Sequence, residues 1–98
     1  MADNPSFPVG TASIVWYDSS HNFHMRVYST GGYTVTERCN DGQGWTNGFT
    51  CNGSNVSAVT WADSQGQHIR LYATYQDTTT EWCNDPTTGW TQGSYTQP

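Results

Sequence analysis

His68-Ile69-Arg70-Leu71-Tyr72 repeats a pattern that the chain has already used 44 residues earlier, in His24-Met25-Arg26-Val27-Tyr28. In both segments polar and apolar side chains alternate, which is typical of a β-strand that buries one face. The match extends in both directions at an offset of 44 or 45 residues, pairing Ser13–Trp16 with Ala58–Trp61, Thr36–Asp41 with Thr80–Asp85, and Gly44–Gly48 with Gly89–Gly93. The chain is therefore two tandem copies of one unit of about 44 residues.

Each unit contains short runs rich in Val, Ile, Thr, Tyr and Trp, separated by clusters of Gly, Asn, Asp and Ser. Such runs predict strands that are joined by turns. No segment has a sustained apolar period of 3.6 residues, so essentially no helix is expected. The expected strands are 13–17, 24–29, 34–39 and 45–50 in the first unit, and 57–62, 68–73, 78–83 and 90–95 in the second.

The fold class predicted from these units is all-β. Four short strands in about 44 residues is the size of a propeller blade, which buries both of its faces only between other blades. Two blades cannot close a ring, since closed propellers have about four to eight, so several chains must share one ring. One eight-stranded sandwich or barrel is the alternative. The expected organisation is a tail at 1–10, one blade at 11–54 and a second at 55–98, together forming one structural domain.

Composition excludes several classes of partner. The 98 residues carry a net charge of −5 and include three Arg and no Lys, which disfavours nucleic acids and anionic membrane surfaces. Only 34% of the residues are hydrophobic, so a chain this small needs burial from a partner, a metal or disulfides.

Three cysteines cannot all pair within one chain. Cys39 and Cys83 hold equivalent places in the two units, too far apart for a disulfide. We expect three buried free thiols, with an intermolecular bridge through Cys51 as the lesser option.

Residues 1–10 have no basic start and no apolar core, so no secretory signal peptide is expected. No apolar run reaches membrane-spanning length, which predicts a soluble chain whose export route, if any, is not visible.

Charged residues are rare, yet an Arg and a Glu recur in the same frame of both units: Arg26 with Glu37, and Arg70 with Glu81. Neighbouring strands can bring each pair together. Arg donates a planar fork of hydrogen bonds and Glu accepts from adjacent hydroxyls, so the pair suits a sugar. An indole can cover the apolar C–H face of the same sugar.

Other interpretations stay open for the recurring residues. Each Arg–Glu pair can be a plain cross-strand ion pair. Trp16 and Trp61 are expected in the core, and Tyr28 and Tyr72 in packing or at a rim. The recurring histidines, His24 and His68, are expected to be structural and hydrogen-bonded within the sheet.

Several motifs carry a resemblance to a known family, in order and in both copies. They are Arg26–Tyr28, Thr36–Cys39, Asp41–Trp45, Asn55–Ser57, His68–Tyr72, Thr79–Cys83 and Gly89–Thr91. They resemble the small two-blade fucose-binding lectins of bacteria, which are relatives of the six-bladed fungal fucose lectins. The resemblance covers about residues 11 to 96.

The resemblance implies a homotrimer that closes a six-bladed ring, with sugar sites between adjacent blades and no metal or cofactor. Arg26 and Glu37 would meet Trp90 within the chain. Arg70 and Glu81 would meet Trp45 of a neighbouring chain. Backbone N–H groups near Gly48-Phe49 and Gly93-Ser94 would also contact the sugar. The implied ligands are L-fucose and fucosylated glycans.

One departure from the family concerns the residue after each recurring Cys, where the family has an aromatic and this chain has Asn40 and Asn84. Losing an indole contact weakens a sugar site by about tenfold. Either the sites are weaker, another aromatic substitutes, or the preferred sugar differs.

The sequence thus predicts a multivalent lectin that performs no reaction. One alternative is a structural or protein-interaction propeller with weak or retuned sugar sites. A glycosidase that uses Glu37 and Glu81 is disfavoured, because catalytic carboxyls must lie about 5–9.5 Å apart and these two belong to different blades.

Overall fold

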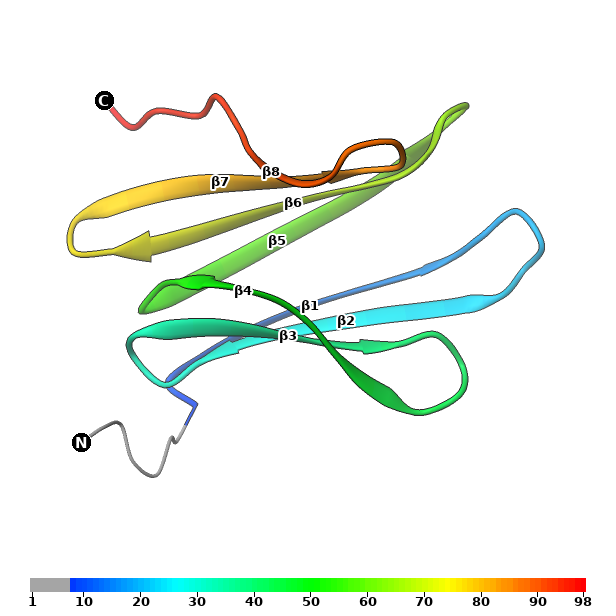
Figure 1. Ribbon diagram of the computed structural model, residues 1–98, viewed down its shortest axis with the longest axis horizontal. Helices are drawn as coiled ribbons and strands as arrows, with labels where there is room; N and C mark the ends of the chain where they lie inside the picture. The colour runs from blue at the N-terminus through cyan, green and yellow to red at the C-terminus, as the bar shows by residue number, and fades with distance from the viewer. Residues whose placement is uncertain (1–7) are drawn as a thin grey trace.

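The computed structural model describes residues 8–98 and consists of two four-stranded antiparallel sheets (Figure 1). The first sheet contains β1 (Gly10–Tyr17), β2 (Phe23–Thr30), β3 (Thr34–Asn40) and β4 (Trp45–Asn52). The second contains β5 (Asn55–Asp63), β6 (Gly66–Tyr75), β7 (Thr78–Asp85) and β8 (Gly89–Gln92). Within each sheet every strand pairs with its neighbour in the chain. Residues 8–98 include no helix, hence none long and apolar enough to cross a membrane.

All eight expected strands are present in the expected order, and most are longer at their ends by one to three residues. The last expected strand, 90–95, was wrong at its C-terminal end, because β8 ends at Gln92. Beyond it, the Tyr95 N–H donates a hydrogen bond to the Glu81 side chain, 3.1 Å away, and so leaves the backbone ladder. The expected tail lies mostly outside the described residues.

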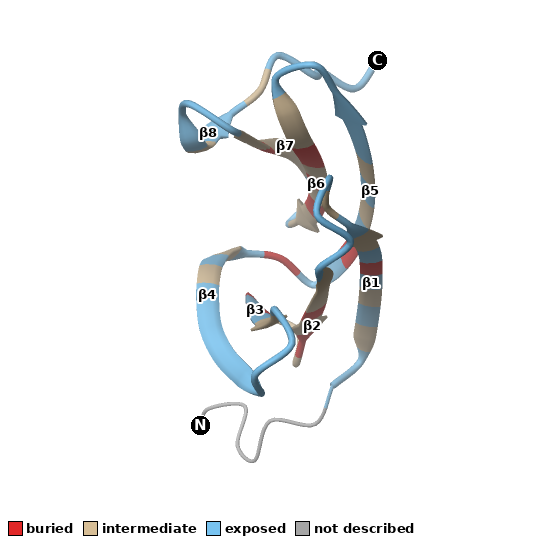
Figure 2. Ribbon diagram, turned by 90° about the vertical axis from the view of Figure 1, so that its right-hand side faces the viewer, coloured by how far each residue is buried: buried red, intermediate tan, exposed pale blue. Residues whose placement is uncertain are grey.

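The two sheets are arranged like neighbouring blades. The first strands, β1 and β5, lie side by side, and the last strands, β4 and β8, lie at the opposite, outer edge (Figure 2). A short connection after β4 carries the chain back to β5, where the second sheet begins. Each sheet therefore runs outward from a common inner edge, as the blades of a propeller do.

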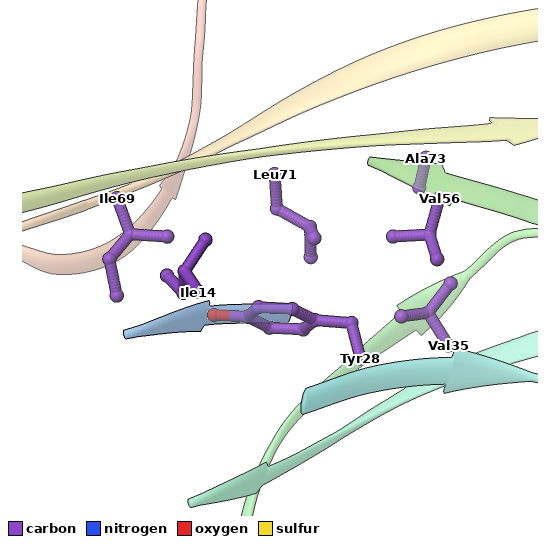
Figure 3. Close-up of a cluster of buried hydrophobic side chains, with 7 residues drawn as sticks. All are labelled: Ile14, Tyr28, Val35, Val56, Ile69, Leu71 and Ala73. Carbon is purple, nitrogen blue, oxygen red and sulfur yellow. The ribbon is translucent and has the colours of Figure 1, made fainter. Parts of the chain in front are cut away.

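The hydrophobic core fills the space between the sheets (Figure 3). The first sheet contributes Ile14, Tyr28 and Val35, and the second contributes Val56, Ile69, Leu71 and Ala73. Ile69 and Leu71 alternate along β6 with Arg70 and Tyr72, which therefore point to the other face of their sheet, as the sequence pattern predicts. Burial of these side chains is the main favourable contribution to packing the two sheets together.

Unlike faces of the two sheets meet in this core. We call the face with the recurring Arg and Glu the site face and the other the back face. The site face of the first sheet packs on the back face of the second. Ile14 is buried, but its counterpart Val59 on the second site face is 52% exposed. A symmetric sandwich would bring like faces together, so this packing is that of successive propeller blades.

Candidate functional site

Glu37 is the most deeply held charged group of the first blade and is only 5% exposed. The Tyr28 hydroxyl donates a hydrogen bond of 2.7 Å to its Oε2 atom, and the Phe49 N–H donates one of 2.9 Å to Oε1. Burial and this bond together raise the pKa of Tyr28, so the phenol stays a donor. The carboxylate is thus fixed in one orientation by two donors.

An irregularity of the β3–β4 ladder provides the second of these donors. Thr36 pairs with Thr50 and Arg38 with Asn47, so both Gly48 and Phe49 lie opposite Glu37. A β-bulge of this kind leaves a backbone group without a ladder partner, and here the Phe49 N–H turns to the Glu37 carboxylate. One of the N–H groups expected near the sugar therefore orients the acceptor.

Arg26 lies beside Glu37, with 3.9 Å between its Nε atom and Oε2 of the carboxylate. Its Nη1 atom donates to Asp41 Oδ1 and to the Met25 carbonyl, each at 2.9 Å. The guanidinium also lies over the Trp16 ring, 5.0 Å from its centroid. Asp41 and Trp16 hold the fork of Arg26 on the site face, next to the carboxylate.

The second blade supplies an aromatic ring to the same place. Trp90 of β8 stacks on Phe49, with 4.3 Å between the ring centroids and 13° between the planes. It also meets the edge of Tyr28, whose hydroxyl holds Glu37. Three residues that the sequence singled out, Arg26, Glu37 and Trp90, thus come together between the blades.

The second blade repeats this arrangement on its uncovered site face. The Tyr72 hydroxyl donates to Glu81 Oε2 at 2.8 Å, which is the main reason that the pKa of Glu81 is lowered. Arg70 donates to both oxygens of Asp85, at 2.8 and 3.4 Å, and lies over the Trp61 ring. The expected partner from a neighbouring chain, Trp45, is exposed on β4 of the first blade.

The remaining site residues from the sequence have clear positions. Asn40 Oδ1 accepts the Gly42 N–H at 2.8 Å and so shapes the β3–β4 turn, and Asn84 lies opposite Trp90 in the β7–β8 ladder. Gly93 lies against the carboxylate of Glu81, as Gly48 lies against that of Glu37. In the first site, Phe49 is a candidate substitute for the missing family ring, because it stacks on Trp90. Ser94, the counterpart of Phe49, offers no ring in the second.

The recurring tyrosines and aspartates hold site residues in place, a role that the sequence pattern did not predict for them. Tyr28 is fully buried and anchors Glu37, where packing or a rim was expected. Trp61 was expected in the core and is 43% exposed in the single chain. Asp41 and Asp85 hold the two arginines, and their recurrence after Cys-Asn in both units was the signal that could have found them.

The cysteines are free, and no group of three potential metal ligands occurs among residues 8–98. Cys83 is buried, whereas Cys39 and Cys51 are only half-buried, less than expected.

A groove of about 520 Å³ also opens between the blades, lined in part by Phe49, Cys51 and Trp82. Neither the Arg nor the Glu of a site lines this groove.

Comparison with known proteins agrees with this geometry. Residues 4–98 match the model of a family described as fungal fucose-specific lectin. The chain belongs to this family. A solved structure of a fucose lectin from Kordia zhangzhouensis, in complex with methyl-fucoside, is similar to this lectin-family chain, with 35% sequence identity and a TM-score of 0.77. The match covers 96% of this chain and 71% of that one. A search of curated proteins finds no match.

Family membership confirms the resemblance that the sequence motifs predicted, and it agrees with the packing of the two sheets as propeller blades. Lectins bind carbohydrate and do not transform it, so the family is one of binding proteins and not of enzymes. Asn40 and Asn84 remain a departure from the family. The stacked rings of Phe49 and Trp90 can supply the aromatic surface that this departure removes.

Proposed function

We propose that this chain is a multivalent lectin that binds L-fucose and fucosylated glycans in the clefts between its blades. The observation that carries the proposal is the site formed by Arg26, Glu37 and Trp90, which joins a fixed donor, a fixed acceptor and an indole from the next blade. Its occurrence in a member of a fucose-specific lectin family gives the sugar class.

The chemistry of this site matches a monosaccharide. Glu37 is already oriented by Tyr28 and Phe49, so its remaining lone pairs can accept from two sugar hydroxyls without reorganisation. Arg26 donates to hydroxyl or ring oxygens from the adjacent position. Trp90 and Phe49 provide the apolar wall against which C–H groups can pack.

A second site follows from the second blade. Arg70 and Glu81 are held by the same kinds of partner, but their site face is uncovered in the single chain. The back face of another copy's first blade would cover it and bring the exposed Trp45 of that copy to the site. Val15 on the back face and Val59 on the site face are 50% and 52% exposed, as expected for surfaces that a second copy buries.

This contact is heterologous, because two different surfaces meet, so repeating it closes a ring or continues indefinitely. Three chains would close a ring of six blades, within the usual range of about four to eight. Such a ring would carry two kinds of site in alternation. Weak individual sites would then act together on a glycan-coated surface.

Calorimetry with L-fucose, and with D-galactose for comparison, tests the proposal. We expect two fucose molecules per chain in the unaltered protein and one per chain in either Glu37→Gln or Glu81→Gln. The matched control is Asp77→Asn, which removes a carboxylate from the β6–β7 turn at a φ of 69°, a conformation that Asn tolerates. Absence of heat with every monosaccharide, from a stable ring, would instead support a structural propeller.

A further inference from the structure

A chain of four side chains leads away from each proposed sugar site. In the first blade, Arg26 donates to Asp41 Oδ1 at 2.9 Å, and the same oxygen is 2.6 Å from Nδ1 of His24. The other ring nitrogen of His24, Nε2, is 2.9 Å from Oδ2 of Asp18 in the β1–β2 turn. The imidazole is therefore held between two carboxylates, one of which also holds the arginine.

The second blade has the same chain at nearly the same distances. Arg70 donates to Asp85 Oδ1 at 2.8 Å, which is 2.6 Å from Nδ1 of His68. Nε2 of His68 is 2.9 Å from Asp63 Oδ2, an ion-pair contact whose alignment is poorer than that of a hydrogen bond. Two turns of different sequence thus place a carboxylate at the same ring nitrogen of each histidine, which indicates a functional role for this contact.

Aromatic stacking adds a tryptophan to each of these side-chain networks. Trp16 lies flat on His24, and Trp61 on His68, with 5.2 Å between the centroids and 16° between the planes in both cases. The guanidinium groups of Arg26 and Arg70 lie over the same two indoles. Each histidine is thus fixed against rotation by the same indole that contacts the neighbouring arginine.

A carboxylate at each ring nitrogen requires an N–H on both nitrogens, which only the charged imidazolium has. A neutral ring would direct a lone pair at one of the two carboxylates. The bond to Asp18 is the largest cause that raises the pKa of His24, followed by that to Asp41. For His68 the bond to Asp85 is the largest cause that raises the pKa, and the contact with Asp63 is the second.

We propose that His24 and His68 are positioning residues for the sugar-binding arginines: in the imidazolium form they fix Asp41 and Asp85, which in turn fix the forks of Arg26 and Arg70. This inference rests on the proposed function, because it assumes that the two arginines bind the sugar.

The direction of the pH dependence follows from the raised pKa of each histidine. The imidazolium and its two contacts are fully present at pH values below 6.5, the ordinary value, and are lost as the pH rises through the higher value in the folded chain. Fucose affinity should therefore fall on the alkaline side. Burial raises the pKa of Cys39 and Cys83, and Tyr28 and Tyr72 also titrate later than usual, which keeps these site-face groups out of the same window.

NMR of the unliganded full chain tests the inference without any sugar. We expect the side-chain N–H signals of Arg26 and Arg70 to broaden or shift together with deprotonation of His24 and His68. Arg38 is the internal control, because it donates to Asn47 at 2.9 Å and has no histidine in its contacts. If the signals of Arg26, Arg70 and Arg38 all stay unchanged while the histidines titrate, the proposal is overturned.

Calorimetry then links this ordering to affinity. Between about pH 6 and about pH 9 we expect fucose binding to weaken roughly three- to tenfold in the unaltered protein, as one weakened hydrogen bond would cause. The double variant His24→Asn and His68→Asn keeps an amide donor near each Nδ1 position and should retain binding with a flat pH profile. An unchanged alkaline decline in that variant would overturn the proposal.

Two further variants keep the result interpretable. His21→Asn alters the third histidine, which has a φ of 66° that suits Asn and lies outside the network, so it should leave the profile unchanged. Asp18→Asn retains an Oδ1 acceptor for the Ser20 and Asn22 N–H groups but removes the outer charge, so it should move the decline to lower pH at the first site. If the unaltered chain binds no fucose at any pH, the proposed function fails, and the arginine signals alone still decide whether the histidines position the arginines.

Discussion

Oε1 of Glu37 lies so close to the Cα of Gly48 that a β-carbon at Gly48 would overlap with it. Glu81 and Gly93 have the same relationship in the second blade. The acceptor of each proposed site therefore packs directly on the backbone of the next strand. Glycine is required here by this close approach, because neither residue has a positive φ.

Gly48→Ala and Gly93→Ala should each strongly weaken sugar binding at one site while the chain still folds. The new methyl group would meet the carboxylate end of the Glu side chain, which can swing away, and the Sγ atom of Cys39 or Cys83, which must also shift. All of these are side-chain atoms and not backbone, so we expect reduced stability but a folded chain. The displaced carboxylate loses its fixed orientation, and we expect a loss of at least about tenfold in fucose affinity at that site. Calorimetric stoichiometry measures this loss.

The control for the two glycine variants is Gly10→Ala, where the new methyl group would lie 3.4 Å from a Thr30 methyl in ordinary contact. Its sugar binding should equal that of the unaltered chain. Normal affinity at both sites of a Gly48→Ala chain would show that the orientation of Glu37 does not matter for the ligand.

Tyr72→Phe should raise the pH at which the second site stops binding fucose on the acid side. The hydrogen bond from Tyr72 is the largest cause that lowers the pKa of Glu81 below 4.5, and the ionised form is the better acceptor. The contribution of Glu81 to stability and binding is present above 4.5 and is lost as the pH falls through the lowered value. Without the hydroxyl that value should rise towards 4.5.

Binding isotherms at successive acid pH values measure the Tyr72 effect, and Tyr33→Phe is the control because Tyr33 is exposed at the β2–β3 turn. An acid limit that is the same in all three proteins would contradict the role given to Tyr72.

Phe49→Ala should weaken only the site within the chain. Phe49 stacks on Trp90 at 4.3 Å, whereas its counterpart in the second unit is Ser94. If Phe49 replaces the family aromatic that is missing at Asn84, its removal costs about tenfold in affinity at one site and nothing at the other. Calorimetry should then resolve two classes of site. Ser94→Ala is the matched control, and tighter fucose binding by Phe49→Ala would mean that the ring obstructs the site.

The strands and the convergence of Arg26 with Glu37 could be predicted from the sequence, because both depend on local alternation and on neighbouring strands. Tyr28 pairs with Glu37 and Arg26 with Cys39, so Arg26 and Glu37 are diagonal neighbours on one face. Duplication made the pattern visible against a background of few charges.

What could not be predicted depends on the shapes of turns and on an irregular register. Asp18 reaches His24 at 2.9 Å only through the shape of the β1–β2 turn, which no periodicity reports. Asp41, by contrast, continues the alternation of Glu37 and Cys39 and lies diagonally across from Arg26. Phe49 donates to Glu37 because a bulge shifts the ladder by one residue. The covered and uncovered site faces also look alike in sequence, since only the packing of the blades distinguishes Trp16 from Trp61.

Val15→Lys and Val59→Lys should each convert the proposed ring into single chains. Both valines are half-exposed in the chain, so a Lys there can reach solvent and the two-blade unit should still fold. In a ring the same positions would be buried between the back face of one chain and the site face of the next, where an unpaired charge is strongly unfavourable. Light scattering should change from the mass of three chains to that of one.

The loss of assembly should also change the sugar stoichiometry in a way that identifies the two sites. A single chain keeps the cleft that holds Arg26, Glu37 and Trp90, since both of its blades come from that chain. It loses the site of Arg70 and Glu81, because Trp45 must come from another copy. We therefore expect one fucose per chain in either variant and two in the control Tyr33→Lys, which places the same charge at a turn. Two sugars per chain in a monomeric variant would mean that the second site does not need a neighbouring chain.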